Sequence, residues 1–341
     1  MRRRSGQVGE RIMAETYHVI GLGNAIVDVI APAGDAFLLE HNIAKGVMTL
    51  VDDFRADQLI RVLPEAQEIA GGSAANTMAG LASLGGRGSF VGKVKADRLG
   101  RSFAASLQGL GVGYTTEMAH SGPATACSII VVTPDGHRSM NTYLGASREI
   151  GPDDIRETEI AAAEILYVEG YLWDAQDAKL AIKKAMKAAK AAGRKVALTL
   201  SDPFCVARWR GEFIELLPQL DILFANEEEV KALFEVEDFD AALQALRGWP
   251  GIAALTRSEK GCVTARGEEL HVLDAVPVDA VIDTTGAGDQ FAAGFLFGLT
   301  HGKDLAQSGR LGALAAAEVI SHYGARPETR LSILASEAGL L

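Results

Sequence analysis

The second half of the chain alternates short apolar runs with longer amphipathic stretches, and this alternation restricts the fold more than any other feature. Runs typical of strands lie at 165–169, 195–200, 221–224, 252–256 and 278–282. Patterns typical of helices lie at 153–163, 175–192, 226–234, 239–247, 287–299 and 304–321. This order predicts a mostly parallel sheet with helices on both faces. In such sheets, ligands bind beyond the carboxyl ends of the strands.

The first half is predicted to differ from this regular pattern. Two β-rich stretches, about 31–55 and 113–146, interrupt it, and the first is predicted to form short turns rather than a helix. The second contains a hairpin signal with a Pro-Asp-Gly turn at 134–136. We expect the two stretches to pair into a small β lid on a single domain covering 16–341. Residues 1–15 are predicted to form a disordered tail.

Composition excludes several classes of partner. The net charge of −11 disfavours binding to nucleic acids or anionic membranes, and no run of 18 apolar residues predicts a membrane span. Cys127, Cys205 and Cys262 are far apart and form no metal-binding or disulfide pattern. We therefore expect a cytoplasmic protein that acts on a small molecule.

A glycine-rich turn near the C-terminus carries the strongest functional signal. The segment Asp-Thr-Thr-Gly-Ala-Gly-Asp at 283–289 lies between the last predicted strand and a helix of small residues. Gly286, Ala287 and Gly288 allow close approach of a ligand, and the free N–H groups of a first helical turn favour an anion. Asp289 would lie beside that anion, where its carboxylate can take a proton from an attacking hydroxyl. If only the Gly-Ala-Gly-Asp part of this motif were present, a purely structural helix cap would be the alternative interpretation.

Two further groups of residues are candidates for holding the acceptor. Gly71, Gly72 and Ser73 open a predicted helix, and Asn76 lies one turn into it, where its amide can donate to and accept from hydroxyl groups. Asp28, placed at the end of the first strand, can accept both protons of a vicinal diol. Each feature also occurs in a purely structural role.

Taken together, the two glycine-rich segments resemble the signatures of the ribokinase (pfkB-type) family of sugar and nucleoside kinases. DTTGAGDQFAAGF at 283–295 is similar to the C-terminal signature, and GGSAANTMAGLASLG at 71–85 is similar to the N-terminal one. The resemblance extends over about 16–330. It implies a three-layer α/β/α fold with a small β lid, ATP-dependent phosphoryl transfer, Asp289 as the base and 286–288 as the anion hole.

The resemblance also implies a nucleotide site. Asn226 and Glu229 match an Asn-x-x-Glu motif that organises Mg²⁺ and phosphate through water, although a capped helix start has the same pattern. Thr256 and Gly261 match a nucleotide-binding segment in which Ser258 replaces the first glycine.

Three more residues match positions with a known role in this family. Arg138, in the lid hairpin, matches an arginine that reaches the phosphates in nucleoside kinases. Asp283 and Thr285 match positions at which some members bind potassium. The implied cofactors are therefore ATP and Mg²⁺, with K⁺ required by some members.

The acceptor is predicted to be adenosine. Residues 21–28 resemble the start of adenosine kinases, and Asn24 and Asp28 match the two side chains that hold the ribose. Tyr171 follows a predicted strand in a chain with only 6% aromatic residues, and its ring could stack on a purine. The alternative is that Tyr171 packs in the core or at a lid hinge, together with Trp173. The expected apolar cover for the base consists of Met48, Leu50 and Cys127.

We therefore expect transfer of phosphate from ATP to the 5′-hydroxyl of adenosine by a monomeric enzyme. Open alternatives on the same fold are kinases of inosine or guanosine and kinases of ribose or a fructose-like sugar. An oxidoreductase is disfavoured, because Ile26 occupies the third glycine position of the dinucleotide pattern that starts at Gly21. A binding protein without activity would not need Asp289 beside an intact anion hole.

Overall fold

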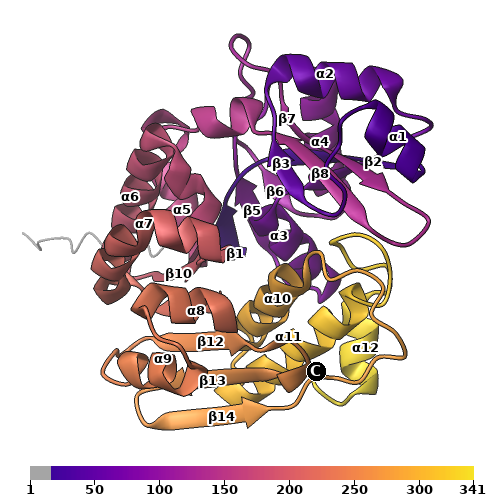
Figure 1. Ribbon diagram of the computed structural model, residues 1–341. Coiled ribbons are helices and arrows are strands. Elements are labelled where there is room, and N and C mark those ends of the chain that lie inside the picture. Colours follow the sequence, from indigo (N-terminus) through magenta and orange to yellow (C-terminus); the bar gives the residue numbers. More distant parts are fainter. Residues whose placement is uncertain (1–16) are drawn as a thin grey trace, which may run out of the picture.

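The computed structural model describes residues 17–341, and the predicted tail at 1–15 lies outside the described residues. A nine-stranded sheet with the order β14-β13-β12-β11-β10-β9-β1-β5-β6 forms the centre of the molecule (Figure 1). All neighbouring strands are parallel except the edge strands β13 and β14. The strands are β1 (Tyr17–Leu22), β5 (Gly88–Val91), β6 (Gly113–Tyr114), β9 (Ala163–Glu169), β10 (Lys195–Thr199), β11 (Ile222–Asn226), β12 (Ile252–Thr256), β13 (Cys262–Arg266) and β14 (Glu269–Leu273).

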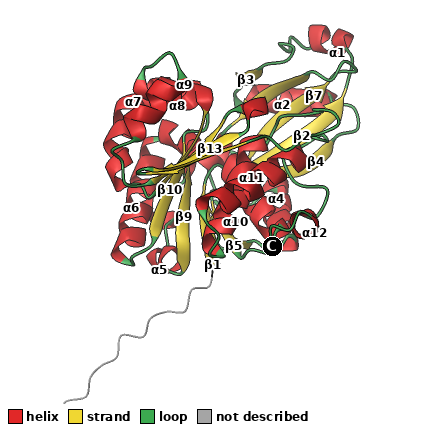
Figure 2. Cartoon of the chain, turned by 90° about the horizontal axis from the view of Figure 1, so that it is seen from below, coloured by secondary structure: helices red, strands yellow, loops and turns green. Residues whose placement is uncertain are grey.

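Helices cover both faces of this sheet (Figure 2). One layer contains α3 (Ser73–Ser83), α10 (Ala287–Thr300), α11 (Leu305–Val319) and α12 (Leu331–Glu337). The other contains α5 (Glu157–Ala161), α6 (Gln176–Ala191), α7 (Pro203–Leu216), α8 (Glu227–Phe234) and α9 (Phe239–Leu246). Successive residues of one strand enter opposite cores, as Val19 and Ile20 do, because strand side chains alternate. The predicted three-layer α/β/α architecture is confirmed.

Local sequence explains where several helices begin. Asp202 accepts a hydrogen bond from the backbone of Cys205 at the start of α7, where Pro203 also suits the first helical position. Asp97 caps α4 (Arg98–Gly109) in the same way. These caps satisfy N–H groups that have no partner inside the helix.

A smaller sheet stands beside the central one, in the order β3-β8-β7-β2-β4 (Figure 1). Its strands are β2 (Ile26–Pro32), β3 (Met48–Leu50), β4 (Gln67–Gly71), β7 (Ala126–Val132) and β8 (Arg138–Tyr143). One face carries Val27, Val29 and Cys127, which are buried in the core that also contains side chains of α2 (Asp53–Val62) and α4. The opposite face carries Asp28, which pairs in register with Ser128.

Three predictions for the connections are wrong. The run at 278–282 is not a strand: it is partly exposed, and Ile282 donates to the carbonyl of Ile320 at the end of α11 (2.8 Å). The β13–β14 hairpin forms the sheet edge instead. The stretch 31–55 contains the short helix α1 (Asp35–Glu40). The predicted first strand divides after Leu22, so Asp28 lies in the middle of β2 in the smaller sheet rather than at a strand end.

No helix within residues 17–341 is both long and apolar enough to cross a membrane.

Candidate active site

Most candidate residues lie at the edge where the parallel strands of the central sheet end. Asn226 and Thr256 close β11 and β12 and are neighbours in register. Glu169 closes β9. The first turns of α3 and α10 lie side by side near this edge, because Asp289 of α10 contacts Ser73 and Asn76 of α3.

Asp289 is the centre of the acceptor side. One carboxylate oxygen accepts from the Ser73 hydroxyl (2.6 Å) and the other from the Asn76 amide (3.4 Å). Burial raises the pKa of Asp289 to about 7, the Ser73 and Asn76 hydrogen bonds lower it, and the charge of Glu169 raises it. The side chain is therefore poised between its protonated and ionised forms near neutral pH, which suits a general base.

The neighbouring Gln290 fixes the position of α10 against α3. Gln290 is fully buried, and its amide donates to the carbonyls of Asn76 (3.0 Å) and Ala325 (2.9 Å). A Cβ at Gly80 would lie 1.9 Å from Oε1 of Gln290, so the two helices can meet only because α3 has a glycine there. The sequence motif contained Gln290, but this role depends on a helix some 200 residues away and was not predicted.

The predicted anion hole has the backbone that such a loop needs. Gly286 has φ +80, and a Cβ there would lie 2.7 Å from the Cα of Ala325. No atom lies within 4 Å of a Cβ built on Gly288, so the first turn of α10 is open at this point. Glycine leaves these N–H groups accessible, and the helix dipole favours an anion there. The loop therefore fits a phosphoryl group.

Arg138 and Asp283 contact each other at the start of this loop. The Arg138 guanidinium donates to Oδ2 of Asp283 within a nearly buried ion pair. Asp283 also accepts from the backbone and hydroxyl of Thr285 (3.0 and 2.6 Å) and from the backbone of Gly324 (3.0 Å). Although burial acts to raise it, these hydrogen bonds and Arg138 hold the pKa of Asp283 below its usual value. The carboxylate oxygens of Asp283 are therefore occupied by these four donors, and any potassium ion at Asp283 and Thr285 would have to use their backbone carbonyls.

Asp28 lies across from the base on the smaller sheet. Both it and Arg138 belong to the face opposite the buried Val27, and a Cβ at Gly71 would lie 2.6 Å from Oδ2 of Asp28. Burial raises the pKa of Asp28 to about 6, while the charges of Arg138 and Arg326 lower it. Within residues 17–341, its carboxylate accepts no hydrogen bond. This leaves both oxygens available to an acceptor molecule.

Asn24, a candidate ribose ligand, contacts the buried Glu169. Its amide donates to Oε1 of the buried Glu169 (2.8 Å), and the second oxygen of Glu169 accepts from the backbone of Ala74 (3.0 Å). Gly72 has φ +93, and a Cβ there would lie 2.1 Å from the Asn24 carbonyl. Asn24 thus joins the turn after β1 to the start of α3. Sequence reasoning missed Glu169, whose only signal was a charged residue at the end of a buried strand.

Arg326 is a second residue that sequence reasoning missed. It lies between α11 and α12, and its Nε donates to Oδ1 of Asn76 (3.1 Å) while Nη1 donates to the hydroxyl of Ser106 (3.1 Å). Burial lowers the pKa of Arg326 to about 10 despite the nearby charge of Asp28. A single arginine in a polar connection carries no sequence signal that separates it from a solvated one.

The residues expected to contact a base are only partly brought together. Met48 and Leu50 are exposed, and in register they continue the face that carries Asp28. Cys127 points to the opposite face and is buried in the core there, so it cannot cover a ligand near Asp28. Cys127 lies on this face because successive side chains of a strand point to opposite faces, and the sequence alone did not reveal which face faces the core.

The two aromatic residues after β9 separate. Trp173 is buried in the helix-covered core, where its Nε1 donates to Glu212 (2.9 Å). Tyr171 is 36% exposed, and its hydroxyl donates to the carbonyl of Ser201 (3.1 Å). The core-packing alternative thus describes Trp173, whereas the ring of Tyr171 remains accessible at the carboxyl edge of the sheet.

Asn226 and Glu229 form a reciprocal helix cap on the nucleotide side. The Asn226 side chain accepts from the backbone of Glu229 (2.8 Å), and both oxygens of Glu229 accept from Asn226 (2.6 and 3.0 Å). The two residues therefore form the helix cap that their sequence pattern also allowed. Burial raises the pKa of Glu229 to about 7, and the charges of Asp202 and Asp289 act in the same direction. A nearby positive charge would lower the pKa of Glu229 and stabilise its ionised form.

The turn between β12 and β13 carries Ser258 and Gly261. Gly261 has φ +78, and a Cβ there would lie 2.0 Å from the carbonyl of Leu273, so only glycine fits. Ser258 has φ +52, a left-handed conformation that is costly for a residue with a Cβ. The family's glycine at this position is replaced, yet the backbone keeps the conformation that glycine would adopt.

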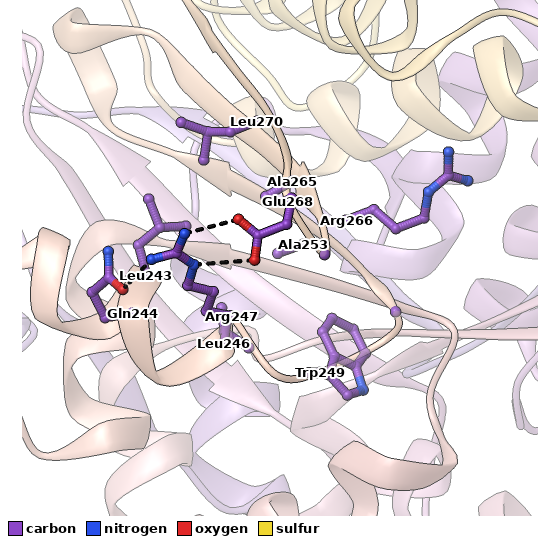
Figure 3. Close-up of a pocket in the computed structure, with 12 residues that line it drawn as sticks. Leu243, Gln244, Leu246, Arg247, Trp249, Ala253, Ala265, Arg266, Glu268 and Leu270 are labelled. Carbon is purple, nitrogen blue, oxygen red and sulfur yellow. Dashed lines mark hydrogen bonds and ion pairs between the residues drawn. The ribbon is translucent and has the colours of Figure 1, made fainter.

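One well-formed cavity lies away from all of these residues. It has a volume of about 250 Å³ and is lined by Leu243, Trp249, Ala253 and Leu270, with the Arg247–Glu268 ion pair at its rim (Figure 3). Its position at the beginning of β12 places it at the end of the sheet opposite Thr256. The cavity is therefore separate from the candidate active site.

Comparisons with known proteins agree with this geometry. The family model described as pfkB family carbohydrate kinase matches residues 47–330. Adenosine kinase of Saccharomyces cerevisiae is 29% identical over 335 residues, with 91% of this chain and 96% of that protein covered. The crystal structure of adenosine kinase from Sinorhizobium meliloti is 49% identical, with a TM-score of 0.87 and 94% and 99% of the two chains covered.

A probable sugar kinase protein from Rhizobium etli is similarly related, with 46% identity, a TM-score of 0.89 and coverage of 96% and 100%. The chain belongs to the pfkB carbohydrate kinase family. It is a phosphotransferase that acts on a nucleoside or sugar, and ATP is its phosphate donor.

The raised pKa of Asp289 predicts a pH-dependent gain of stability in the Asp289→Asn variant. The pKa is about 7 in the folded protein against an ordinary 3.8, so the carboxyl contributes stability below about pH 4 that is lost as the pH rises through 7. The variant should therefore gain more melting temperature over the wild type at pH 8 than at pH 5. Thermal melts at the two pH values measure this. An equal change of melting temperature at the two pH values would contradict the burial of an ionised carboxylate.

The left-handed conformation of Ser258 predicts that Ser258→Gly stabilises the protein. Removal of the Cβ relieves about 1 kcal/mol of backbone strain, reduced by the greater entropy of glycine in the unfolded chain. Urea unfolding should show a free energy of unfolding about 0.5 kcal/mol higher for the variant than for the wild type. Gly261→Ala is the matched control and should be strongly destabilising, because its Cβ would lie against the carbonyl of Leu273. A loss of stability in Ser258→Gly would overturn this prediction.

Proposed function

We propose that the chain transfers the γ-phosphoryl group of ATP to the 5′-hydroxyl of adenosine, giving AMP and ADP. The observation that carries this proposal is the position of Asp289. Its carboxylate lies in the first turn of α10, directly after the open Gly286–Gly288 backbone, and contacts Ser73 and Asn76 of α3. A base and an anion site therefore adjoin each other, as phosphoryl transfer to an alcohol requires.

The chemistry divides between these groups. The ionised Asp289 takes the proton of the acceptor hydroxyl while the hydroxyl oxygen bonds to the γ-phosphorus and the bond from that phosphorus to the ADP oxygen breaks. The N–H groups at 286–288 and the guanidinium of Arg138 stabilise the negative charge on the phosphoryl oxygens. Closure of the smaller sheet over the site would exclude water and so prevent hydrolysis of ATP.

Four observations support adenosine as the acceptor. The unpartnered carboxylate of Asp28 suits the vicinal diol of a ribose. Met48 and Leu50 give the same face of the smaller sheet exposed apolar surface for a base, and the ring of Tyr171 is accessible for stacking. The yeast and Sinorhizobium relatives are adenosine kinases. Inosine and guanosine are the nearest alternatives, since they share the ribose.

A sugar acceptor is the second candidate. It is favoured by the similarity to the probable sugar kinase protein from Rhizobium etli, which covers 96% of this chain at 46% identity. Asp28 and Asn76 would serve a sugar diol equally well. The apolar face at Met48 and Leu50 would then have no ligand group to cover, and this difference makes adenosine the better proposal.

Magnesium fits the nucleotide side only through water. Within the part of the chain described, no three His, Cys, Asp or Glu side chains are arranged to hold a metal ion directly. Glu229 is buried with a raised pKa, so a nearby cation would stabilise its ionised form, and Asn226 orients it. We propose that these two residues hold Mg²⁺ through water, where the ion would supply charge neutralisation at the phosphates.

We also propose that the enzyme acts as a monomer. The residues assigned to the base and the acceptor lie close together within one copy of the chain. Sedimentation velocity with and without adenosine and ATP would detect a dimer if one is required.

The proposed acceptor predicts the outcome of a substrate screen. Release of ADP should be fastest with adenosine among adenosine, inosine, guanosine, ribose and fructose. In Asp289→Asn, turnover of the best acceptor should fall by at least ~10²-fold while ATP binding is retained, because the base is lost. Near-normal turnover in this variant would rule out Asp289 as the base, and a preference for a sugar would rule out adenosine.

Stacking on Tyr171 predicts a selective loss of acceptor affinity. Tyr171→Ala should raise the KM for adenosine far more than the KM for ATP, because a stacked aromatic contact contributes on the order of 1 kcal/mol. Trp173→Phe is a control for general disturbance of the same segment, since Trp173 lies in the core. Equal increases in both KM values would argue against stacking.

A further inference from the structure

Arg326 contacts Asn76, which in turn contacts Asp289, the proposed base. Its Nε donates to Oδ1 of Asn76, and the Nδ2 of the same amide donates to Oδ2 of Asp289. The three side chains come from the α11–α12 connection, from α3 and from α10. They form a chain of hydrogen bonds from a peripheral loop to the catalytic carboxylate.

The direction of this chain follows from the chemistry of arginine. A guanidinium only donates hydrogen bonds, whereas an asparagine amide has one accepting and one donating end. With Arg326 on one side, the oxygen of Asn76 faces Arg326 and its NH₂ group faces Asp289. The opposite orientation would place an amide oxygen against the carboxylate and an NH₂ group against the guanidinium. Arg326 therefore selects the orientation that donates to the base.

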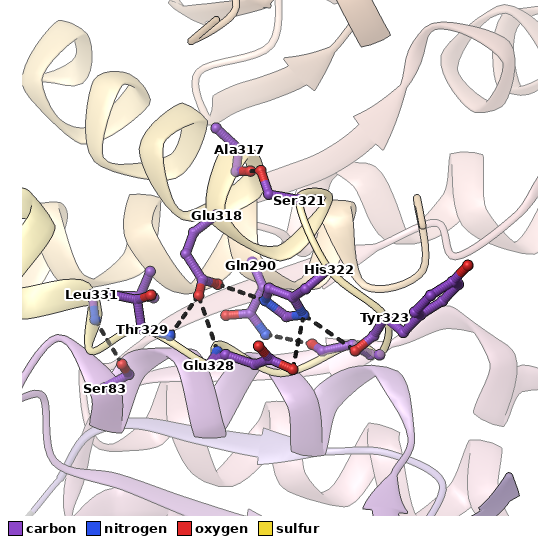
Figure 4. A network of polar contacts seen from close by, with 12 residues as sticks. Ser83, Gln290, Ala317, Glu318, Ser321, His322, Tyr323, Glu328, Thr329 and Leu331 are labelled. Carbon is purple, nitrogen blue, oxygen red and sulfur yellow. Dashed lines mark hydrogen bonds and ion pairs between the residues drawn. The ribbon is translucent and has the colours of Figure 1, made fainter. Parts of the chain in front are cut away.

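The loop that carries Arg326 is held at several points (Figure 4). Glu318 accepts from the backbones of Glu328 (3.0 Å) and Thr329 (2.6 Å) and from His322 (3.2 Å). On the other side of Arg326, the carbonyl of Ala325 accepts from Gln290 (2.9 Å). Because these contacts lie on both sides of Arg326, the guanidinium has a defined position.

Stability does not explain this arginine. Its Nη2 is buried and finds no hydrogen-bond partner among the described residues, and burial lowers its pKa. Both features cost free energy that an apolar side chain of similar length would avoid. A costly group that contacts the partner of the proposed base points to a role in the reaction.

We infer that Arg326 is a positioning residue, which orients the Asn76 amide so that its NH₂ group donates to the Asp289 carboxylate and holds that base toward the acceptor hydroxyl. This role rests on Asp289 as the base of the proposed reaction, but it applies to a nucleoside and a sugar acceptor alike. The titratable groups that interact with the charge of Asp289 are Asp28, Glu169, Glu229 and Tyr167, all acidic. In this acidic setting the Asn76 donor matters for keeping the base ionised.

Arg326→Met tests the orientation. Without the guanidinium, the Asn76 amide is free to rotate and the base loses a defined donor, so kcat should fall about tenfold, which corresponds to one hydrogen bond to a charged group. The acid limb of the pH profile of kcat/KM should move to higher pH, while the KM for ATP stays unchanged. Arg330→Met, at an exposed position of the same loop, should behave as the wild type.

A double-mutant cycle separates positioning from a general structural effect. In an Asn76→Ala background, Arg326→Met should cause little further loss of kcat, because the residue through which it acts is absent. If its effect is undiminished there, or if Arg326→Met alone leaves kcat and the pH profile unchanged, the inference is wrong. Should Arg326→Met fail to fold, Arg326→Gln replaces it in the cycle, since a glutamine amide can donate or accept and so does not select one orientation of Asn76.

The outcome does not depend on which acceptor is correct. The cycle is measured with whichever acceptor the wild-type enzyme phosphorylates fastest, so a failure of adenosine in the screen leaves the test of Arg326 intact. Conversely, turnover of adenosine together with a fully additive cycle would support the proposed function and refute the role of Arg326.

Discussion

The contact between α3 and α10 is the interaction on which the rest of the site depends. These helices lie some 200 residues apart in the chain and meet at Gly80, where a Cβ would lie against Gln290. Gln290 then bonds to the backbone of Asn76, and the adjacent Asp289 reaches Ser73. A glycine-rich start on each helix places the Asp289 carboxylate and the Asn76 amide side by side. Neither helix has this function alone.

The site gathers acidic groups that burial makes reluctant to ionise. The pKa values of Asp28, Glu229 and Asp289 are raised to about 6, 7 and 7, and burial is the largest cause for each. Arg138 and Arg326 bring positive charge to the same region. Such an arrangement is costly for folding but useful for binding phosphates and for moving a proton near neutral pH. Because these carboxyls are reluctant to ionise and two arginines lie near Asp28, the region carries less negative charge than its residues alone would suggest.

Several elements were predictable because their signals are local. Helices α6 and α10 and the hairpin of β7 and β8 follow from periodicity, a glycine-rich helix start and a turn motif. The prediction of a strand at 278–282 was wrong because an extended connection has the same local sequence pattern as a strand, and only hydrogen-bonded pairing with a neighbour distinguishes the two. Helix α1 was not predicted because its six residues are too few to show a helical periodicity.

The sequence by itself determined the alternation of strands and helices in the second half of the chain and the two glycine-rich helix starts, because each depends on residues close together in the chain. Only the tertiary structure decided which side chains meet. It placed Cys127 in the core rather than beside Asp28, turned Asn24 toward Glu169, paired Arg138 with Asp283 and brought Arg326 to Asn76. These contacts depend on strand parity and on packing between distant segments, which no local pattern encodes.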